Sequence, residues 1–179
     1  TVGPFEMLEK LGSGGMGSIF RARNRITDEI VAIKLLAPER TKTIDTERFL
    51  REARIACTLQ HPGLVHGSSF GNDGGQPFFA MEFIEGESLK ERLQRVGALP
   101  QFIAIDMLLR VARALDYLHK QGHLHRDSKP ENIMLSKDGE VKLCDIGLAR
   151  EMDMITTLTQ TGQVVGTSPY ISSDTPPGK

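Results

Sequence analysis

The chain has 179 residues, of which 39% are hydrophobic and 25% charged, and its formal net charge is −1. This is a globular composition with room for a substantial core, and the balanced charge gives no reason to expect a nucleic-acid or membrane surface. The longest apolar helical pattern, residues 103–118, carries four charged residues and is too polar to span a bilayer. Cys57 and Cys144 match no zinc spacing and favour a reduced, cytoplasmic setting.

The first part of the chain, residues 1–84, predicts a small β-sheet with one helix. Three short runs have the length and β-branched content of strands: residues 5–11, 18–23 and 29–36. Residues 45–60 carry their apolar side chains on one helical stripe, and "HPG" at 61–63 ends that helix. A buried strand is expected at residues 77–84.

The second part, residues 85–179, has a mainly helical pattern. Helices are expected over residues 88–96 and 102–120. Six apolar residues of the second helix are expected to form one buried face: Ile105, Leu108, Leu109, Ala112, Leu115 and Leu118. A hairpin is then expected, in which Ile133 and Leu135 face Val141 and Leu143 across an Asp138-Gly139 turn.

The stretch "GSGGMGSI" at residues 12–19 joins the first two predicted strands. Its glycines would let backbone N–H groups approach phosphate oxygens with no side chain in the way. Alone, this pattern is weak, because glycine-rich hairpin turns are common. Its position between two strands disfavours a dinucleotide-binding fold, which needs a helix N-terminus for the pyrophosphate.

Lys34 lies in "VAIK" on the third predicted strand. A lysine in a strand is ordinarily the solvent-facing half of an alternating pattern. Glu52, however, falls on the apolar stripe of the following helix, and an unpaired buried carboxylate is costly. Lys34 and Glu52 are therefore a candidate ion pair, which would leave the ammonium group aimed at the phosphates of a ligand.

The loop "HRDSKPEN" at residues 125–132 and the segment "DIG" at 145–147 complete an ordered set of motifs. Asp127 precedes Asn132 by five residues, and Asn132 precedes Asp145 by 13. With the glycine-rich stretch and Lys34, this order resembles the eukaryotic-type protein kinase family. The segments "HPGLV", "MEFIEGESL" and "GTSPY" resemble its bacterial serine/threonine branch.

The resemblance extends from Phe5 to Tyr170 and implies an α+β fold with two lobes. Residues 1–84 would form an N-lobe, an antiparallel β-sheet with one helix, and residues 85–179 a mainly helical but incomplete C-lobe. The pattern departs from the family at the end, where "SDTPPGK" replaces the expected continuation. We therefore expect a truncated chain whose second long helix exposes an apolar patch, because the helices that normally cover it are missing.

The resemblance implies ATP and Mg²⁺ and gives the loop residues their roles. Asp127 would accept or orient the proton of a substrate hydroxyl, and Lys129 would neutralise charge on the transferred phosphoryl group. Asn132 and Asp145 would hold Mg²⁺ through oxygen atoms. Phosphoryl transfer has a loose transition state, so positioning and electrostatics supply most of the catalysis.

The nucleotide-binding residues that the resemblance implies are Gly12, Ser13, Gly14, Gly15, Met16, Gly17, Ile19, Ala32, Lys34, Glu52, Met81, Glu82, Ile84 and Met134. Met81 would be the gatekeeper of the pocket, and Glu82 and Ile84 would offer backbone groups to adenine. Ala32 and Met134 would sandwich the adenine ring.

Arg126 implies control by phosphorylation, because in this family such an arginine binds a phosphate on the activation segment. Thr159 and Thr161 are the favoured acceptors in that segment, residues 145–170. The alternative, that threonines simply abound in a solvated loop, stays open. Thr167 is expected to be a hydrogen-bond partner of Asp127 and Lys129.

The function implied is a serine/threonine protein kinase that transfers the ATP γ-phosphate to protein hydroxyls and autophosphorylates its activation loop. Its partners would be a protein substrate and a second kinase chain for trans-autophosphorylation, with no nucleic acid and no membrane segment. A truncated, catalytically silent remnant that binds ATP or a partner is the alternative. A small-molecule phosphotransferase is a third hypothesis, and Lys129 weighs against it, because a lysine two residues after the aspartate marks the protein-directed branch.

Overall fold

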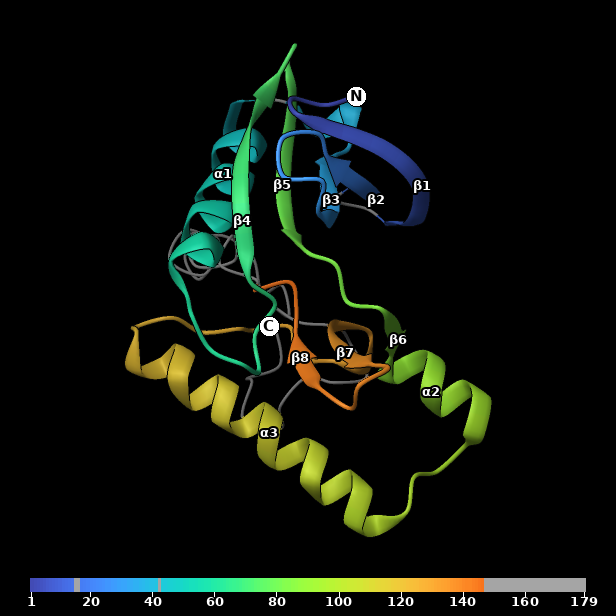
Figure 1. Cartoon of the computed structure of the whole chain (residues 1–179). Coiled ribbons are helices and arrows are strands. Elements are labelled where there is room, and N and C mark those ends of the chain that lie inside the picture. The colour runs from blue at the N-terminus through green and yellow to red at the C-terminus, as the bar shows by residue number, and fades with distance from the viewer. Residues whose placement is uncertain (15–16, 42, 147–179) are drawn as a thin grey trace. The chain divides into compact units, whose positions relative to one another are not determined.

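The computed structural model describes residues 1–14, 17–41 and 43–146 (Figure 1). Its contacts divide the chain into two compact units: residues 1–61 with 65–85, and residues 62–64 with the chain from residue 86 onward. The first contains an antiparallel sheet with a helix, and the second contains helices and a small antiparallel sheet. The predicted α+β class is confirmed. The lobe boundary after residue 84 stays a prediction.

The first unit is built on a five-stranded sheet with the order β1-β2-β3-β5-β4, in which neighbours are antiparallel. Its strands are β1 (Phe5–Gly14), β2 (Gly17–Asn24), β3 (Ile30–Leu36), β4 (Gly67–Asp73) and β5 (Gln76–Glu82). Four of these lie where strands were predicted. The strand β4 was missed, because "GSSFGND" is polar and glycine-containing and forms a strand only by pairing with β5.

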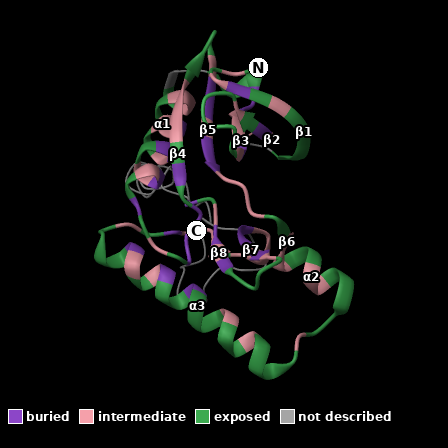
Figure 2. Cartoon of the chain, in the orientation of Figure 1, coloured by how far each residue is buried: buried purple, intermediate pink, exposed green. Residues whose placement is uncertain are grey.

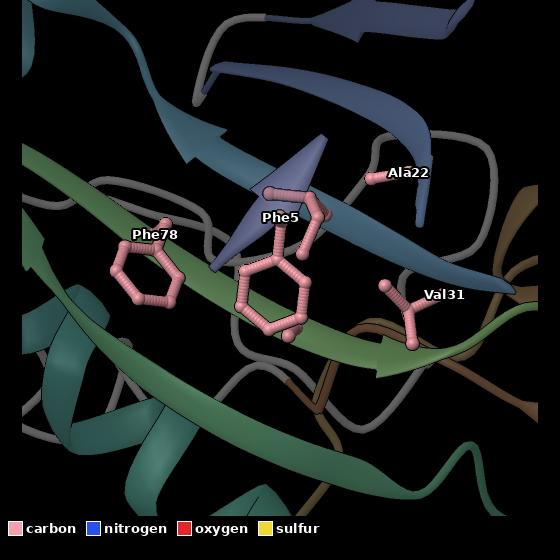
Figure 3. Packing of buried hydrophobic residues seen from close by; sticks show 6 residues of the cluster. Phe5, Ala22, Val31 and Phe78 are labelled. Atoms are coloured by element: carbon pink, nitrogen blue, oxygen red, sulfur yellow. The ribbon is translucent and has the colours of Figure 1, made fainter. Parts of the chain in front are cut away.

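Phe5 and Phe78 anchor the core of this sheet (Figure 3). Their rings meet edge to face, with centroids 5.8 Å apart and planes at 66°. The two aromatic residues belong to β1 and β5, which are separated in the sheet by β2 and β3, so the contact ties distant strands together. The other buried members of the cluster are Ala22, Val31, Ile33 and Ala80.

The helix α1 (Thr43–Thr58) follows a short 3₁₀ turn, Pro38–Arg40, and packs against β4 and β5 (Figure 1). The predicted apolar stripe is buried, with Phe49 7% and Ala53 1% exposed. Gly67 allows the close approach of β4, because a Cβ there would lie 2.9 Å from the backbone nitrogen of Cys57. The strand and the helix therefore meet through backbone.

The second unit combines α2 (Leu89–Val96) and α3 (Gln101–Lys120) with a sheet of order β6-β7-β8. The strands are β6 (Gly86–Ser88), β7 (Ile133–Ser136) and β8 (Val141–Leu143). The predicted hairpin register is confirmed, since Ile133 pairs with Leu143 and Leu135 with Val141. Gly139 supplies the left-handed turn residue, with φ of 84°.

The helix α3 buries a narrower face than the sequence predicted (Figure 2). Its buried residues are Val111, Ala114 and Leu118, on the half of the helix that contacts β8. Four residues of the predicted face are instead exposed: Ile105 by 49%, Leu108 by 64%, Leu109 by 52%, and also Ala112. The predicted buried face was therefore wrong, whereas the expectation of an apolar patch on this helix agrees with these exposures. In the ranges that the structure describes, no helix is long and apolar enough to cross a bilayer.

Replacing Phe5 with alanine should lower the free energy of unfolding of the first unit by about 3–5 kcal/mol, because a fully packed aromatic side chain is lost. Leu8, on the same strand and 41% exposed, is the matched control, and Leu8→Ala should cost less than about 1 kcal/mol. Urea unfolding of both variants measures the difference. Equal losses would contradict the assignment of Phe5 to the core.

Candidate active site

Three residues of the loop between α3 and β7 are joined by side-chain contacts in the second unit. The Asp127 carboxylate lies 2.8 Å, through Oδ2, from Nζ of Lys129. The Asn132 amide nitrogen donates to the same oxygen at 3.1 Å and to the Asp127 carbonyl at 2.8 Å. The Asp127 and Lys129 side chains are only 21% and 23% exposed, so these charge-assisted bonds hold the carboxylate in one orientation.

A short 3₁₀ turn, Pro130–Asn132, brings these residues together. Pro130 fixes the backbone at the start of the turn, and the backbone N–H of Asn132 donates to the Lys129 carbonyl at 2.9 Å. Before the turn, Arg126 adopts a left-handed conformation with φ of 61°, and Asp127 N–H donates back to the His125 carbonyl at 2.9 Å. Strained backbone of this kind is concentrated at functional sites.

Cys144 joins this loop to the segment that carries Asp145. Its backbone N–H donates to the Asn132 carbonyl at 2.9 Å, and its carbonyl accepts a hydrogen bond from Nε2 of His125 at 2.9 Å. Both backbone groups of one residue are thus bonded to the loop. Asp145 is the next residue and has a left-handed backbone, with φ of 57°. Because it directly follows Cys144, the two bonds of Cys144 act as a clamp that restrains the start of the Asp145 segment.

His125 is a buried, neutral member of this clamp, with 2% of its surface exposed. A carbonyl only accepts, so Nε2 carries the proton, and Nδ1 faces the Asp127 N–H at 3.4 Å. Burial lowers the pKa of His125, against the opposing effects of the Cys144 carbonyl and of the Asp145 and Asp127 charges.

The donor atoms at this place suit a hard cation such as Mg²⁺. Asn132 bonds to Asp127 through its side-chain nitrogen, so its side-chain oxygen takes no part in those bonds and could face a cation. Asp145 adds an exposed carboxylate. In the described part of the chain, no three His, Cys, Asp or Glu side chains form a metal-binding group. A cation here would therefore complete its shell with waters and phosphate oxygens, as Mg²⁺ commonly does.

The glycine-rich residues lie in the first unit, on the hairpin of β1 and β2. Gly12, Ser13 and Gly14 end β1, Gly17 and Ile19 belong to β2, and Gly14 pairs with Gly17. Gly17 has φ of 151°, and a Cβ there would overlap the Leu35 carbonyl oxygen. At Gly12 and Gly14 a Cβ would meet nothing within 4 Å. Gly15 and Met16 lie outside the described residues.

Lys34 and Glu52 are also in the first unit. Lys34 is half-buried on β3, where it pairs with Ile19 on β2 and Phe79 on β5. Glu52 is half-buried on α1. Their contact with each other stays a prediction.

The remaining predicted nucleotide-binding residues are divided between the units. Ala32 on β3 and Met81 on β5 are buried and directly paired. Glu82 donates from its N–H to the His66 carbonyl at 2.9 Å, and its Oε1 accepts from the His66 N–H at 2.7 Å. Ile84 follows β5 and is half-buried, as is Met134 on β7 of the second unit. Thr159, Thr161 and Thr167 lie outside the described residues.

One ion pair beside the loop was not predicted from the sequence. Lys90 on α2 lies 2.9 Å, through Nζ, from Oε1 of Glu131. The helix start could have been read from the Ser88–Glu91 capping box, in which each side chain bonds the backbone N–H of the other. The pairing itself joins residues 41 apart, and no local pattern predicts it.

Solved structures share this fold. The crystal structure of the Mycobacterium tuberculosis PknI kinase domain is 30% identical and has a TM-score of 0.73, covering 83% of this chain and 61% of that one. The structure of Rad53 1–466 in complex with AMP-PNP is 28% identical with a TM-score of 0.72, covering 81% of this chain and 38% of that one. The five-stranded sheet and the loop that carries Asp127 therefore belong to a fold that this chain shares with the PknI kinase domain.

Sequence comparison gives the family. The profile of the protein kinase domain matches residues 5–175, so the chain belongs to the protein kinase family. A probable serine/threonine-protein kinase, CPE1738 of Clostridium perfringens, is 36% identical over 171 residues, which are 95% of this chain and 25% of that protein. Serine/threonine-protein kinase PknH of Mycobacterium bovis is 38% identical over 173 residues, 96% of this chain and 29% of PknH. The resemblance inferred from the motifs is confirmed.

Stability should fall below pH 6.5 because of His125. The unfolded imidazole binds a proton below its ordinary pKa of 6.5, whereas the folded one, whose pKa is lower, does so only at more acid pH. The unfolded state therefore binds more protons, and the free energy of unfolding declines as pH falls, by at most about 1.4 kcal/mol per pH unit from this residue. His125→Gln should flatten urea-derived stability between pH 7.5 and 5, and exposed His119→Gln should not. Identical profiles for the two variants would refute the buried neutral imidazole.

Proposed function

We propose that this chain is the catalytic part of a serine/threonine protein kinase, which transfers the γ-phosphate of ATP to hydroxyl groups of protein substrates. The observation that carries the proposal is the Asp127 carboxylate, held at 2.8 Å by Lys129 and at 3.1 Å by Asn132, with the Asp145 segment clamped beside it. The names of the relatives, bacterial serine/threonine-protein kinases, agree with this substrate class.

In this proposal Asp127 accepts or orients the proton of the substrate hydroxyl. Its contact with Lys129 keeps a cation beside the attacking oxygen, where Lys129 offsets the negative charge of the phosphoryl group. The Asn132 bonds stop the carboxylate from rotating, so the reacting atoms need no reorganisation. Lys129 also favours a protein hydroxyl over a small-molecule acceptor.

The same residues fit the cofactors that protein kinases use, ATP with Mg²⁺. Asn132 and Asp145 would hold the cation through oxygen, and Mg²⁺ would neutralise charge on the phosphates. Gly12, Gly14 and Gly17 would let the β1–β2 hairpin cover the phosphates, and Lys34 would bind them. We further propose Thr159 and Thr161 as autophosphorylation sites, a second copy of the chain as the trans partner, and a cytoplasmic location.

A second candidate is a kinase remnant that binds ATP or a partner without transferring phosphate. One observation favours it: Phe102 on α3 is 72% exposed, so this helix presents an apolar side chain on which a partner could pack. Such a remnant would be stabilised by Mg·ATP and would incorporate no phosphate.

Asp127→Asn tests the proposal, because it keeps the shape of the side chain and removes the charge that faces Lys129. Autophosphorylation of the full chain with radiolabelled ATP should fall by about 10²- to 10⁴-fold, the usual contribution of a catalytic base. Thermal stabilisation by Mg·ATP should persist. Asp116→Asn is the matched control, since Asp116 is exposed on α3 and pairs with Lys120.

Equal incorporation by wild type and Asp127→Asn would disprove the catalytic role of Asp127. Stabilisation by Mg·ATP with no incorporation in wild type would select the remnant instead. If Mg·ATP neither stabilises the wild type nor labels it, both candidate functions are ruled out.

A further inference from the structure

We propose that Lys90 is a positioning residue for the catalytic loop and acts through its ion pair with Glu131. The inference rests on the function proposed above for that loop and adds a contact from outside it. Lys90 belongs to α2, whereas Glu131 lies inside the Pro130–Asn132 turn, next to Asn132 and two residues after Lys129.

The geometry of Glu131 makes it dependent on Lys90. Oε1 of Glu131 lies 2.9 Å from Nζ of Lys90, and Oε2 is buried with no hydrogen-bond partner. The Glu131 side chain is 33% exposed and that of Lys90 is 49% exposed, so the pair is partly shielded from water. The hydrogen bond from Lys90 is also the main reason that the pKa of Glu131 is lowered.

Lys90 lies on a helix whose first turn is itself held in place. The capping box of Ser88 and Glu91 holds the first turn of α2, and Ser88 pairs with Met134 across the β6–β7 ladder. The strand β7 begins directly after Asn132. The loop is therefore attached to this part of the unit at two points, by the backbone ladder after the turn and by the ion pair within it.

Movement of Glu131 would reach Asp127 through a short chain of bonds. The backbone N–H of Asn132 donates to the Lys129 carbonyl at 2.9 Å, and the Asn132 side chain donates to the Asp127 carboxylate. Small misplacements of catalytic groups have large effects on rate. For a partly exposed ion pair we expect a two- to fivefold effect, corresponding to roughly 0.4–1 kcal/mol.

The first test is amide hydrogen exchange of the full chain without nucleotide. In Lys90→Met and Glu131→Gln, the Asn132 and Cys144 amides should exchange about two- to fivefold faster, because local opening of the turn becomes easier. Lys90→Arg should restore wild-type exchange. Arg95→Met is the matched control: Arg95 is on the same helix, but its 2.6 Å partner is Glu87, outside the loop.

The second test is kinetic and uses Mg·ATP. Lys90→Met should lower kcat of autophosphorylation about two- to fivefold with KM for ATP unchanged, and Lys90→Arg should recover kcat. The double variant Lys90→Met/Glu131→Gln should be no worse than the more impaired single variant, because both changes break the same contact.

The two tests separate failure of this inference from failure of the proposed function. Faster exchange at Asn132 in Lys90→Met but not in Arg95→Met supports the positioning contact even if the wild type transfers no phosphate. Unchanged exchange in Lys90→Met, equal acceleration in Arg95→Met, or additive effects in the double variant would overturn it. A loss of kcat that Lys90→Arg fails to recover would also overturn it.

Discussion

The structure of the candidate active site depends on the hydrogen bonds made by the backbone of one residue, Cys144. Its N–H is bonded to Asn132 and its carbonyl to His125, so the segment that leads to Asp145 cannot move independently of the loop that carries Asp127. A buried backbone group without a partner is costly, and here both groups are satisfied by the loop. The neutral imidazole of His125 serves both of its contacts, because Nε2 donates to the Cys144 carbonyl while Nδ1 faces the Asp127 N–H.

The density of charge in "HRDSKPEN" follows from this arrangement. Asp127 is opposed by Lys129 and Glu131 by Lys90, while His125 is uncharged. Each carboxylate therefore has a cation at hydrogen-bond distance, and the loop can concentrate charge without strong internal repulsion. Phosphoryl transfer benefits from such an arrangement, because its catalysis comes from fixed charges in fixed positions.

Local patterns predicted much of the fold. The register of the hairpin of β7 and β8 followed from alternating apolar residues and one Asp-Gly turn, because period and turn chemistry are local properties. The strand β4 could not be predicted, since its polar sequence becomes a strand only through β5 and α1. The face of α3 was misassigned for a similar reason: the apolar pattern shows which residues can be buried, and tertiary contact with β8 decides which of them are.

The site was predictable only as a set of residues. Motif order singled out Asp127, Lys129, Asn132 and Asp145 as candidates. The bonds among the first three depend on a left-handed Arg126, and the link to the Asp145 segment depends on the His125–Cys144 contact; neither has a sequence signature. The Lys90–Glu131 pair joins two segments that meet only after β6 pairs with β7. Such contacts between distant segments are properties of the folded chain.

We propose that Asp127, Asn132 and Asp145 gather at one cation-binding place. Paramagnetic Mn²⁺ in the presence of an ATP analogue tests it directly by nuclear magnetic resonance. We expect selective broadening of the amide signals of residues 127–132 and 144–146, with those at the exposed start of α3 unaffected. Broadening confined to other parts of the chain, or none at saturating Mn²⁺ and nucleotide, would contradict it.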